Sequence, residues 1–260
     1  MAGGTPAVPG KEIGLTDLIS PGGKVRMYVE AQLMPGGRVV PSAAQSHYLL
    51  HVMRARTGDG VSLFNGRDGE WLARICEATR RNCALECERK TAEQGRDDDL
   101  WLVFAPIKKT PADYVVQKAT ELGVSALQPV VTRRTMVHRV NTERMRANAM
   151  EAAEQSGRTT VPEIREPREL ARLLAEWPQE RKLLFCDEGG APPMRMALAN
   201  GVAGAWAVLT GPEGGFEEDE RAMIRALPST VPASLGKRIL RADTAALAAL
   251  AVWQAQCPNG

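Results

Sequence analysis

The sequence lacks the features of membrane-spanning and secreted proteins. No run of roughly 18 or more apolar residues occurs in it, which excludes a transmembrane helix. Residues 1–24 are rich in glycine and proline and contain no apolar signal-peptide core. We expect this segment to be a flexible extension, or the product of a misplaced start, and we expect the protein to be cytoplasmic.

Patterns typical of zinc sites and disulfide frameworks are also missing. The five cysteines include no C-x-x-C pair, and their odd number in a chain without a secretory signal favours free thiols. Cys83 and Cys87 share one face of an expected strand over residues 82–88, so we expect both to be buried. His47 and His51 have helical i, i+4 spacing, but no third ligand is evident. We therefore expect no metal site.

Neither G-x-G-x-x-G nor G-x-x-x-x-G-K-[ST] occurs at the loops described below, which disfavours dinucleotide and P-loop sites. The net charge of +2 is too small to identify an RNA-binding protein, so any basic patch must be local. A chain of 260 residues with 44% hydrophobic residues is long enough for two modest domains with ordinary cores.

Two glycine-containing loops near the C-terminus are the most informative features present. The first glycine loop, residues 210–216 (TGPEGGF), follows the apolar run 205–209. The second glycine loop, residues 235–241 (LGKRILR), follows an expected strand over 229–235, with Asp243 or Thr244 as the expected cap of the next helix. Because each loop lies between a strand-like and a helix-like run, both can emerge at one sheet edge and enclose a small-molecule pocket.

The charges around these loops restrict the ligand. Four acidic residues, Glu217, Glu218, Asp219 and Glu220, occupy the expected first helical turn and would repel phosphate. Lys237, Arg238 and Arg241 lie beside the pocket. This combination suits a large anionic substrate and a small cofactor with little negative charge. The helix over 245–253 is apolar on every side, which predicts burial against the sheet, another subunit, or both.

Two domains are expected. Residues 25–90 alternate short strands with turns, including a hairpin loop at 65–69 and one helix over 42–53, and predict a small β-barrel. Residues 91–99 continue a polar stretch that begins at 88, and we interpret them as a linker. Residues 100–260 alternate strands (100–105, 126–131, 182–186, 205–209, 229–235) with helices (111–122, 142–155, 245–253), which predicts an α/β domain with a mainly parallel sheet.

The two glycine loops, together with residues 117–123 (QKATELG) and 151–158 (EAAEQSGR), closely resemble the bacterial 16S rRNA uridine-N3 methyltransferase family of the SPOUT class. The resemblance extends over roughly residues 25–255, with the four motifs in the same order. It implies S-adenosylmethionine as the methyl donor, a C-terminal domain knotted as a trefoil, a PUA-like N-terminal barrel that binds RNA, and a homodimer. The implied substrate is 16S rRNA or the 30S subunit, although related SPOUT enzymes methylate ribose 2′-hydroxyls or guanine.

Backbone groups can bind both the adenine and the amino-acid tail of such a donor. The expected contacts are Leu209, Thr210, Gly211, Glu213, Gly214 and Gly215 at the first loop, and Leu235, Gly236, Ile239, Leu240, Arg241 and Thr244 at the second.

The proton on uridine N3 must leave before or during methyl transfer. Arg241 is the candidate for stabilising the oxyanion that develops on the ring, although it could equally pack on the donor. Glu154 and Glu121 are possible bases, although a salt-bridge or capping role suits each better. No cysteine or histidine is placed to be a nucleophile.

We also expect phosphate contacts, because N3 lies on the pairing edge and the base must be extruded from folded RNA. The candidate residues are Arg26, Arg54, Arg56, Arg67, Lys108, Lys109, Arg133 and Arg134. Two other functions are compatible with the sequence: a non-catalytic RNA-binding dimer, and an enzyme that binds a phosphorylated nucleotide in the same pocket.

Overall fold

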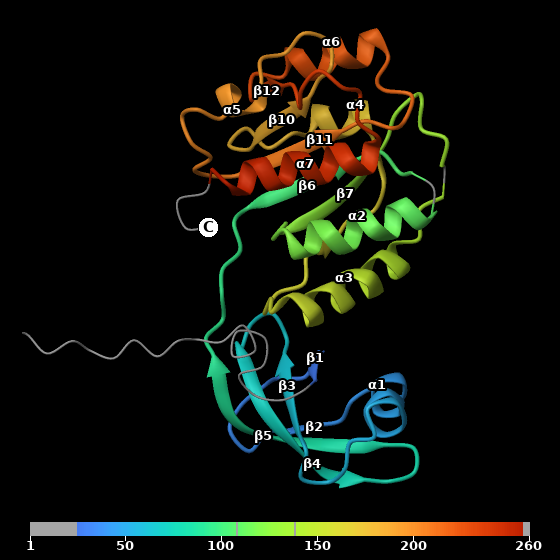
Figure 1. Ribbon diagram of the computed structural model, residues 1–260, viewed down its shortest axis with the longest axis vertical. Coiled ribbons are helices and arrows are strands. Elements are labelled where there is room, and N and C mark those ends of the chain that lie inside the picture. Colours follow the sequence, from blue (N-terminus) through green and yellow to red (C-terminus); the bar gives the residue numbers. More distant parts are fainter. Residues whose placement is uncertain (1–24, 108, 138, 257–260) are drawn as a thin grey trace, which may run out of the picture. The chain divides into compact units, whose positions relative to one another are not determined.

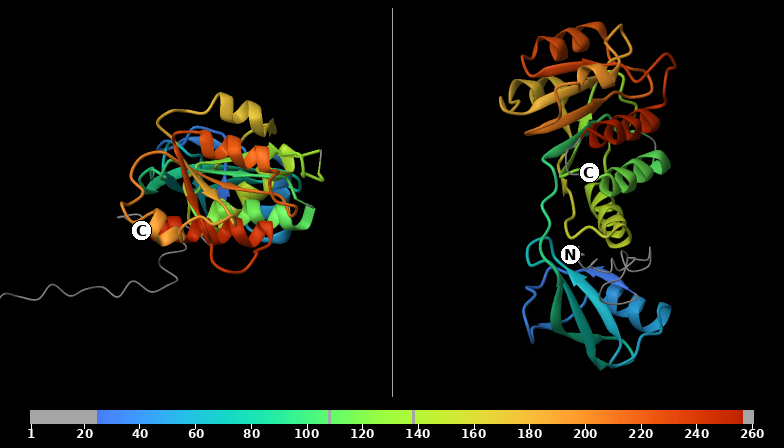
Figure 2. Two further views of the ribbon diagram at one scale, coloured as in Figure 1. Left: turned by 90° about the horizontal axis from the view of Figure 1, so that it is seen from above. Right: turned by 60° about the vertical axis from the view of Figure 1, so that its left-hand side comes forward.

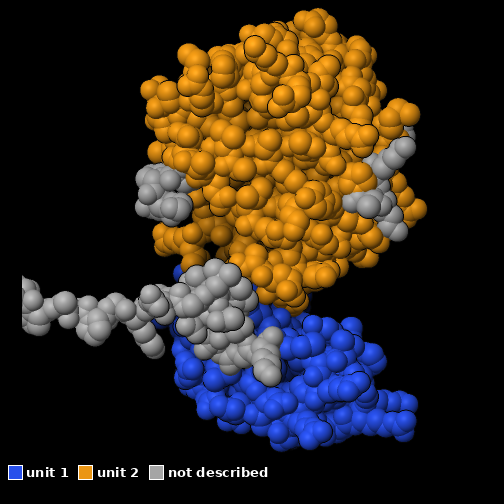
Figure 3. Space-filling view, viewed as in Figure 1, with its two compact units in different colours: residues 1–94 blue, residues 95–260 orange. Residues whose placement is uncertain are grey.

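The chain divides into two units, residues 1–94 and 95–260 (Figure 3), in a computed structural model that describes residues 25–107, 109–137 and 139–256. The side chains of residues 109 and 110 are outside this description. The division between Gln94 and Gly95 lies within the polar stretch 88–99.

The first unit contains a five-stranded sheet in the order β1-β3-β4-β5-β2 (Figure 1). β1 and β3 pair in parallel, whereas the other pairs are antiparallel. Its elements are β1 (Arg26–Tyr28), β2 (Arg38–Val39), α1 (Ala43–His47), the π-helix η1 (Tyr48–Val52), β3 (Gly60–Phe64), β4 (Glu70–Ala78) and β5 (Cys83–Ala92).

The hairpin between β3 and β4 forms where the sequence predicts it. The side-chain oxygen of Asn65 accepts hydrogen bonds from the backbone N–H groups of Arg67 (3.1 Å) and Asp68 (2.9 Å), which closes the turn. The Asp68 carboxylate accepts one from the backbone N–H of Leu33 (2.9 Å), and this bond lowers the pKa of Asp68. Cys83 and Cys87 are both buried in the core of this unit, as expected.

Two expectations for this unit need correction. The helix expected over 42–53 is a short α-helix followed by a π-helical turn, and Ser42 caps it through a reciprocal pair of bonds with Gln45. The strand expected to end at residue 88 continues to Ala92, because the long partner strand β4 pairs with it as far as Glu70. Beyond residue 88, β5 has exposed Arg89 and Lys90 and half-buried Thr91 and Ala92, so hydrophobic periodicity cannot reveal this part of the strand.

The second unit has a sheet in which every pair is parallel, as expected. Its strand order is β12-β10-β11-β6-β7-β8, and β9 also pairs with β7. In chain order the elements are β6 (Leu100–Phe104), α2 (Lys109–Glu121), β7 (Ala126–Val131), α3 (Thr142–Ser156), β8 (Glu163–Ile164), β9 (Arg168–Glu169), α4 (Leu170–Ala175), β10 (Lys182–Cys186), α5 (Met194–Ala197), β11 (Trp206–Thr210), α6 (Glu218–Ala226), β12 (Thr230–Ala233) and α7 (Ala242–Gln254).

Helices cover both faces of this sheet (Figures 1 and 2). Alternate strand residues face opposite ways, so Trp206 and Val208 of β11 pack with α2, α3, α5 and α7. Ala207 and Leu209 of the same strand pack with α4 and α6. The central strands are therefore apolar on both faces, as is usual for a parallel sheet between two helical layers.

The motifs at residues 117–123 and 151–158 meet at the C-terminal end of α2. The Arg158 guanidinium donates to the carbonyl oxygens of Thr120 (2.5 Å) and Val124 (3.1 Å) and pairs with Asp97 (2.6 Å). A cation at this helix end satisfies carbonyl groups that have no partner within the helix. The arginine of residues 151–158 is thus a structural residue that joins α3 to α2.

α7 packs on the sheet through one face only. Ala246, Ala249, Leu250 and Trp253 are buried at helical spacing, whereas Ala251 is exposed and Val252 is partly buried. The outer face of α7 is therefore mostly apolar and only partly covered by the rest of the described residues. None of the described helices combines the length and the apolar composition needed to cross a bilayer.

A buried ion pair stabilises the first unit. Arg26 and Glu70 lie 2.8 Å apart with side chains only 4% exposed, and the guanidinium also lies 4.7 Å from the centre of the Phe64 ring. We predict that Arg26→Ala destabilises this unit by about 3 kcal/mol, because it leaves a buried carboxylate unpaired. Hydrogen exchange of β3 and β4 peptides measures the loss.

The matched control is Arg38→Ala, which removes an exposed ion pair with Glu77. It should leave the exchange rates of the same peptides unchanged. If both substitutions speed exchange equally, burial of the Arg26–Glu70 pair is not the reason for its contribution to stability.

Candidate functional site at the ends of four parallel strands

The site forms between two neighbouring strands, β6 and β11, whose following connections run to opposite sides of the sheet. β6 continues through α2 to β7 on one side, whereas β11 continues through α6 to β12 on the other. α2 and α6 lie on opposite faces of the sheet. The carboxyl ends of β6 and β11 therefore leave a crevice between them, which is where ligands bind in open α/β sheets.

The first glycine loop turns tightly beneath this crevice. Gly215 has φ +70° and its N–H donates to the carbonyl of Pro212 (2.9 Å), which closes a turn. A Cβ on Gly211 would lie 2.8 Å from the Phe216 ring, closer than side chains tolerate. Phe216 is buried and packs edge-on against Phe185 at 5.4 Å between ring centres. The loop needs glycine because its backbone lies directly on this aromatic pair.

Glutamates at the start of α6 hold the loop to the segment that follows β7. Glu220 accepts from the backbone N–H groups of Glu217 and Arg133, each at 2.9 Å. The Arg134 guanidinium donates to both carboxylate oxygens of Glu217 (2.8 and 3.0 Å) and to the carbonyl of Gly214 (2.7 Å). Arg134 holds the pKa of Glu217 below its ordinary value of 4.5 through this pair.

A second ion-pair group supports the loop from below, and sequence reasoning did not find it. The carboxylate of Asp187, which follows β10, is fully buried and binds the guanidinium groups of Arg221 and Arg225. Arg221 also pairs with Glu188 (2.8 Å) and borders the same cavity as the first glycine loop. The only signal in the sequence was an acidic residue placed directly after a buried strand.

The second glycine loop lies beside the first. Gly236 has φ +119°, and Ile239 is 87% exposed although it is apolar. The expected cap is wrong: α7 begins at Ala242 with Arg241 in the N-cap position, and no side chain caps it there. Asp243 instead accepts a hydrogen bond from the backbone N–H of Thr244 (2.8 Å) inside the first turn.

Three adjoining cavities occupy the crevice. The loop cavity, of about 200 Å³, lies between the two glycine loops and the end of β10. A smaller space of about 60 Å³ extends it along the second loop. The connecting cavity, of about 350 Å³, leads toward Ile107 and Pro111 after β6. Glu213, Ile239, Leu240 and Ala242 border both the loop cavity and the connecting cavity, so these two spaces adjoin.

Most of the expected cofactor contacts lie around these cavities. They are Thr210, Gly211, Glu213, Gly214, Gly215, Ile239 and Leu240 at the loop cavity, Leu235 and Gly236 at its extension, and Arg241 at the connecting cavity. Two expected residues do not line them. The Leu209 side chain belongs to the core on the α6 face, and Thr244 is exposed in α7.

The candidates for proton transfer do not gather at the crevice. Glu154 borders none of these cavities and lies about 18 Å along α3 from the helix start, so its role as a base stays a prediction. Glu121 pairs with Lys118 (2.7 Å). Cys186 borders the loop cavity, but burial raises the pKa of its thiol to about 12, so the thiol stays protonated at neutral pH.

One of the expected phosphate contacts needs correction. Arg26 is buried and paired with Glu70, so it cannot reach RNA. Arg133 pairs with Asp219 and Arg134 with Glu217, so both hold the start of α6, and because both side chains are exposed their phosphate contacts stay predictions. Lys108 and the side chain of Lys109 lie outside the described residues. The remaining candidates, Arg54, Arg56 and Arg67, are exposed in the first unit.

The described residues contain no cluster of three or more histidine, cysteine or acidic side chains able to hold a metal ion. His47 and His51 stack with 4.9 Å between ring centres. A nitrogen of His51 lies 3.0 Å from the carbonyl oxygen of Arg80, so a hydrogen bond occupies that nitrogen.

Comparison with known proteins shows related sequences along both units. A family model for an RNA methyltransferase domain matches residues 95–254, and one for an RNA methyltransferase PUA domain matches residues 41–86. A protein of Rickettsia conorii named Ribosomal RNA small subunit methyltransferase E is 31% identical over 232 residues, covering 87% of this chain and 93% of its own length. A protein of the same name from Synechocystis is 32% identical over 231 residues, covering 87% of this chain and 76% of its own length.

Two solved structures share the fold. One is Ribosomal RNA small subunit methyltransferase E from Neisseria gonorrhoeae bound to S-adenosyl methionine, with a TM-score of 0.80, 29% identity, and coverage of 89% of this chain and 97% of that one. The other is a methyltransferase from Legionella pneumophila in complex with the same cofactor, with a TM-score of 0.80, 28% identity and coverage of 89% and 97%. The expected fold class, an α/β domain with a PUA-like first domain, is confirmed.

We predict that Arg134→Ala speeds hydrogen exchange of peptides covering residues 211–217 several-fold, because the loop loses its bonds to the segment after β7. Arg168→Ala, which removes an exposed pair with Glu176 away from the loop, is the matched control.

The same pair predicts a pH dependence in the wild type. Arg134 lowers the pKa of Glu217, so the pair stabilises the loop above pH 4.5, and this stabilisation is lost as the pH falls below about 4.5 and Glu217 is protonated. The same peptides should then lose protection from exchange. Protection factors that stay constant over this pH range, after correction for intrinsic amide exchange, would contradict the role assigned to this pair.

Proposed function

The chain belongs to the RNA methyltransferase family, and we propose that it methylates N3 of a uridine in 16S rRNA, with S-adenosylmethionine as donor. The observation that carries this proposal is the meeting of two glycine loops around one cavity at the ends of β10 and β11. The names of the relatives and the cofactor in the two solved structures support the rRNA substrate and the donor. The uridine target and the SPOUT class rest on the sequence resemblance.

The residues around the loop cavity fit such a donor. Backbone groups of the first glycine loop are accessible because three of its seven residues are glycine, and Gly211 brings the backbone onto Phe216. The acidic start of α6, which disfavours a phosphorylated ligand, does not oppose a cation. Glu213 borders both the loop cavity and the connecting cavity, so its carboxylate can lie near a positively charged sulfur.

When bound, the donor supplies a methyl carbon that breaks its bond to the sulfonium sulfur and forms one with N3, while the N3 proton is released. The protein contributes mainly alignment and electrostatics to this displacement. Arg241 borders the connecting cavity, so its guanidinium can approach the oxygen on which negative charge develops. No covalent intermediate with the protein is needed, because the nitrogen only has to lose its proton, and the Cys186 thiol is protonated.

The wider assignment concerns RNA binding and assembly. The first unit is proposed to bind RNA through exposed Arg54, Arg56 and Arg67. The apolar outer face of α7 supports a homodimer, since such a face is usually covered. A trefoil knot in residues 100–260 and a cytoplasmic location belong to the same proposal.

Calorimetric titration tests the donor site. We predict that the wild type binds S-adenosylmethionine and not ATP, and that Gly211→Ala weakens donor binding at least about tenfold, because the added Cβ displaces the loop from Phe216. Gly95→Ala is the control, since its Cβ would meet the Thr159 hydroxyl at an ordinary 3.5 Å. Binding of ATP alone, or equal donor affinity in both variants, would refute the site.

The target is tested by mass spectrometry of nucleosides from 16S rRNA of a deletion strain. We expect 3-methyluridine to disappear on deletion and to return with the wild-type gene but not with Gly211→Ala. If the methyluridine persists while another methylated nucleoside disappears, the reaction class stands and the target atom is different.

A further inference from the structure

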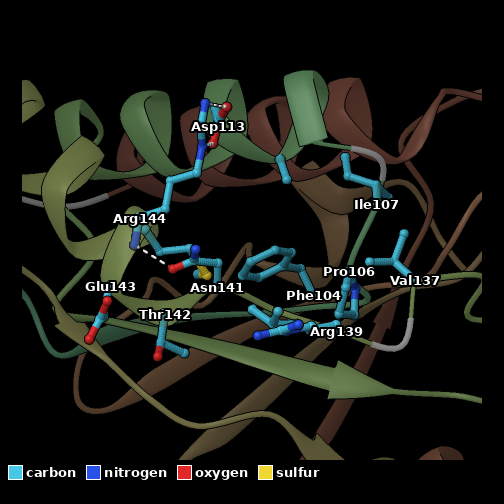
Figure 4. Close-up of a pocket in the computed structure, with 13 residues that line it drawn as sticks. Phe104, Pro106, Ile107, Asp113, Val137, Arg139, Asn141, Thr142, Glu143 and Arg144 are labelled. Atoms are coloured by element: carbon cyan, nitrogen blue, oxygen red, sulfur yellow. Dashed lines mark hydrogen bonds and ion pairs between the residues drawn. The ribbon is translucent and has the colours of Figure 1, made fainter.

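A cavity of about 660 Å³ lies at the ends of β6 and β7, next to the site described above (Figure 4). Its walls come from the segment after β6, the start of α2, and the segment that leads from β7 into α3. It belongs neither to the loop cavity nor to any role assigned so far.

This cavity adjoins the proposed donor site. Ile107 borders both it and the connecting cavity, which in turn shares Glu213 and Leu240 with the loop cavity. The three spaces follow the strand order β10-β11-β6-β7 along one edge of the sheet. A group held at the ends of β6 and β7 can therefore face a methyl donor held at the ends of β10 and β11, with Arg241 between them.

The lining suits a planar, partly polar group. The Phe104 ring, only 4% exposed, forms part of the apolar floor of the cavity, with Ile107 and Val137 nearby (Figure 4). Asn141 uses its side-chain oxygen to cap α3 (2.9 Å to the N–H of Arg144), which leaves its amide N–H groups as donors. Exposed Arg139 borders the cavity and can meet a phosphate.

Two acidic residues line the wall: Glu143, which is exposed at the start of α3, and Asp113, whose charge is compensated. Asp113 is bound by Arg144 through two hydrogen bonds (2.8 and 2.5 Å) and by the Asn148 amide (2.8 Å). These contacts neutralise its charge and brace the start of α2 against α3.

We propose that this cavity receives the extruded pyrimidine nucleotide of the RNA substrate, with its base inside the cavity and its phosphate at Arg139. The inference rests on the proposed methyltransferase function and names the site of the acceptor. The cavity's position beside the proposed donor site favours a substrate over a second copy of the chain.

The test fills the cavity and leaves its surroundings intact. Val137→Trp places an indole in the cavity, whereas Met136→Trp places the same group on the neighbouring residue, which is 82% exposed and does not border the cavity. We expect Val137→Trp to lower kcat/KM for RNA methylation about 100-fold, because the base can no longer reach the donor. The affinity for S-adenosylmethionine should be unchanged in both variants, and Met136→Trp should methylate RNA like the wild type.

Each outcome separates this inference from the function on which it rests. Normal methylation by a folded Val137→Trp protein would overturn the inference and leave the methyltransferase assignment standing. Failure of the wild type to methylate any RNA would remove both. A change in sedimentation of Val137→Trp without RNA would show that a second subunit occupies the cavity, and would also overturn the inference.

Photocrosslinking provides a test that needs no variant. RNA carrying 4-thiouridine at the target position should crosslink to peptides containing residues 104–107 or 137–145 of the wild type. Crosslinks confined to other peptides would refute the assignment even if Val137→Trp failed to fold.

Discussion

The candidate site depends on one topological constraint. The chain leaves β6 toward one side of the sheet and leaves β11 toward the other. Side by side in the sheet, these strands lead to helices on opposite faces, so no connection covers the edge between their carboxyl ends. The connecting cavity lies at this edge, and the loop cavity and the cavity at the ends of β6 and β7 lie on either side of it. The two glycine loops shape it, because only a backbone without Cβ atoms can lie on Phe216 at Gly211 and still present its peptide groups to a ligand.

Most of the charged side chains near the site form ion pairs that fix its loops in place. Arg133 and Arg134, which seemed suited to phosphate, bind the acidic start of α6 and fix the first glycine loop. Asp187 draws two arginines of α6 toward the end of β10. Glu213, Arg139 and Arg241 remain at the cavities, each on a different segment. A weak net charge is therefore compatible with an RNA-modifying enzyme, because local geometry decides which charges can reach a ligand.

Much of the second unit could be read from the sequence. The strand over 182–186 agrees residue for residue with β10, and α2, α3 and β7 agree to within two residues, because buried parallel strands and helices with clear start and stop residues have strong local signals. The continuation of β5 to Ala92 and the π-helical turn at Tyr48–Val52 had no such signal. At the site, the sequence identified both loops, but the predicted cap of α7 was wrong, and Arg26, expected to contact phosphate, is buried.

The sequence by itself determined which segments are strands, which are helices, and where the glycines allow the backbone close to a ligand, because these properties depend on neighbours along the chain. Only the tertiary structure decided which arginines are paired, that Leu209 faces the core, and that a nucleotide-sized cavity adjoins the donor site. Those properties depend on residues far apart in sequence, such as Arg134 and Glu217 or Ile107 and Leu240, which come together only when the parallel strands align in their final order.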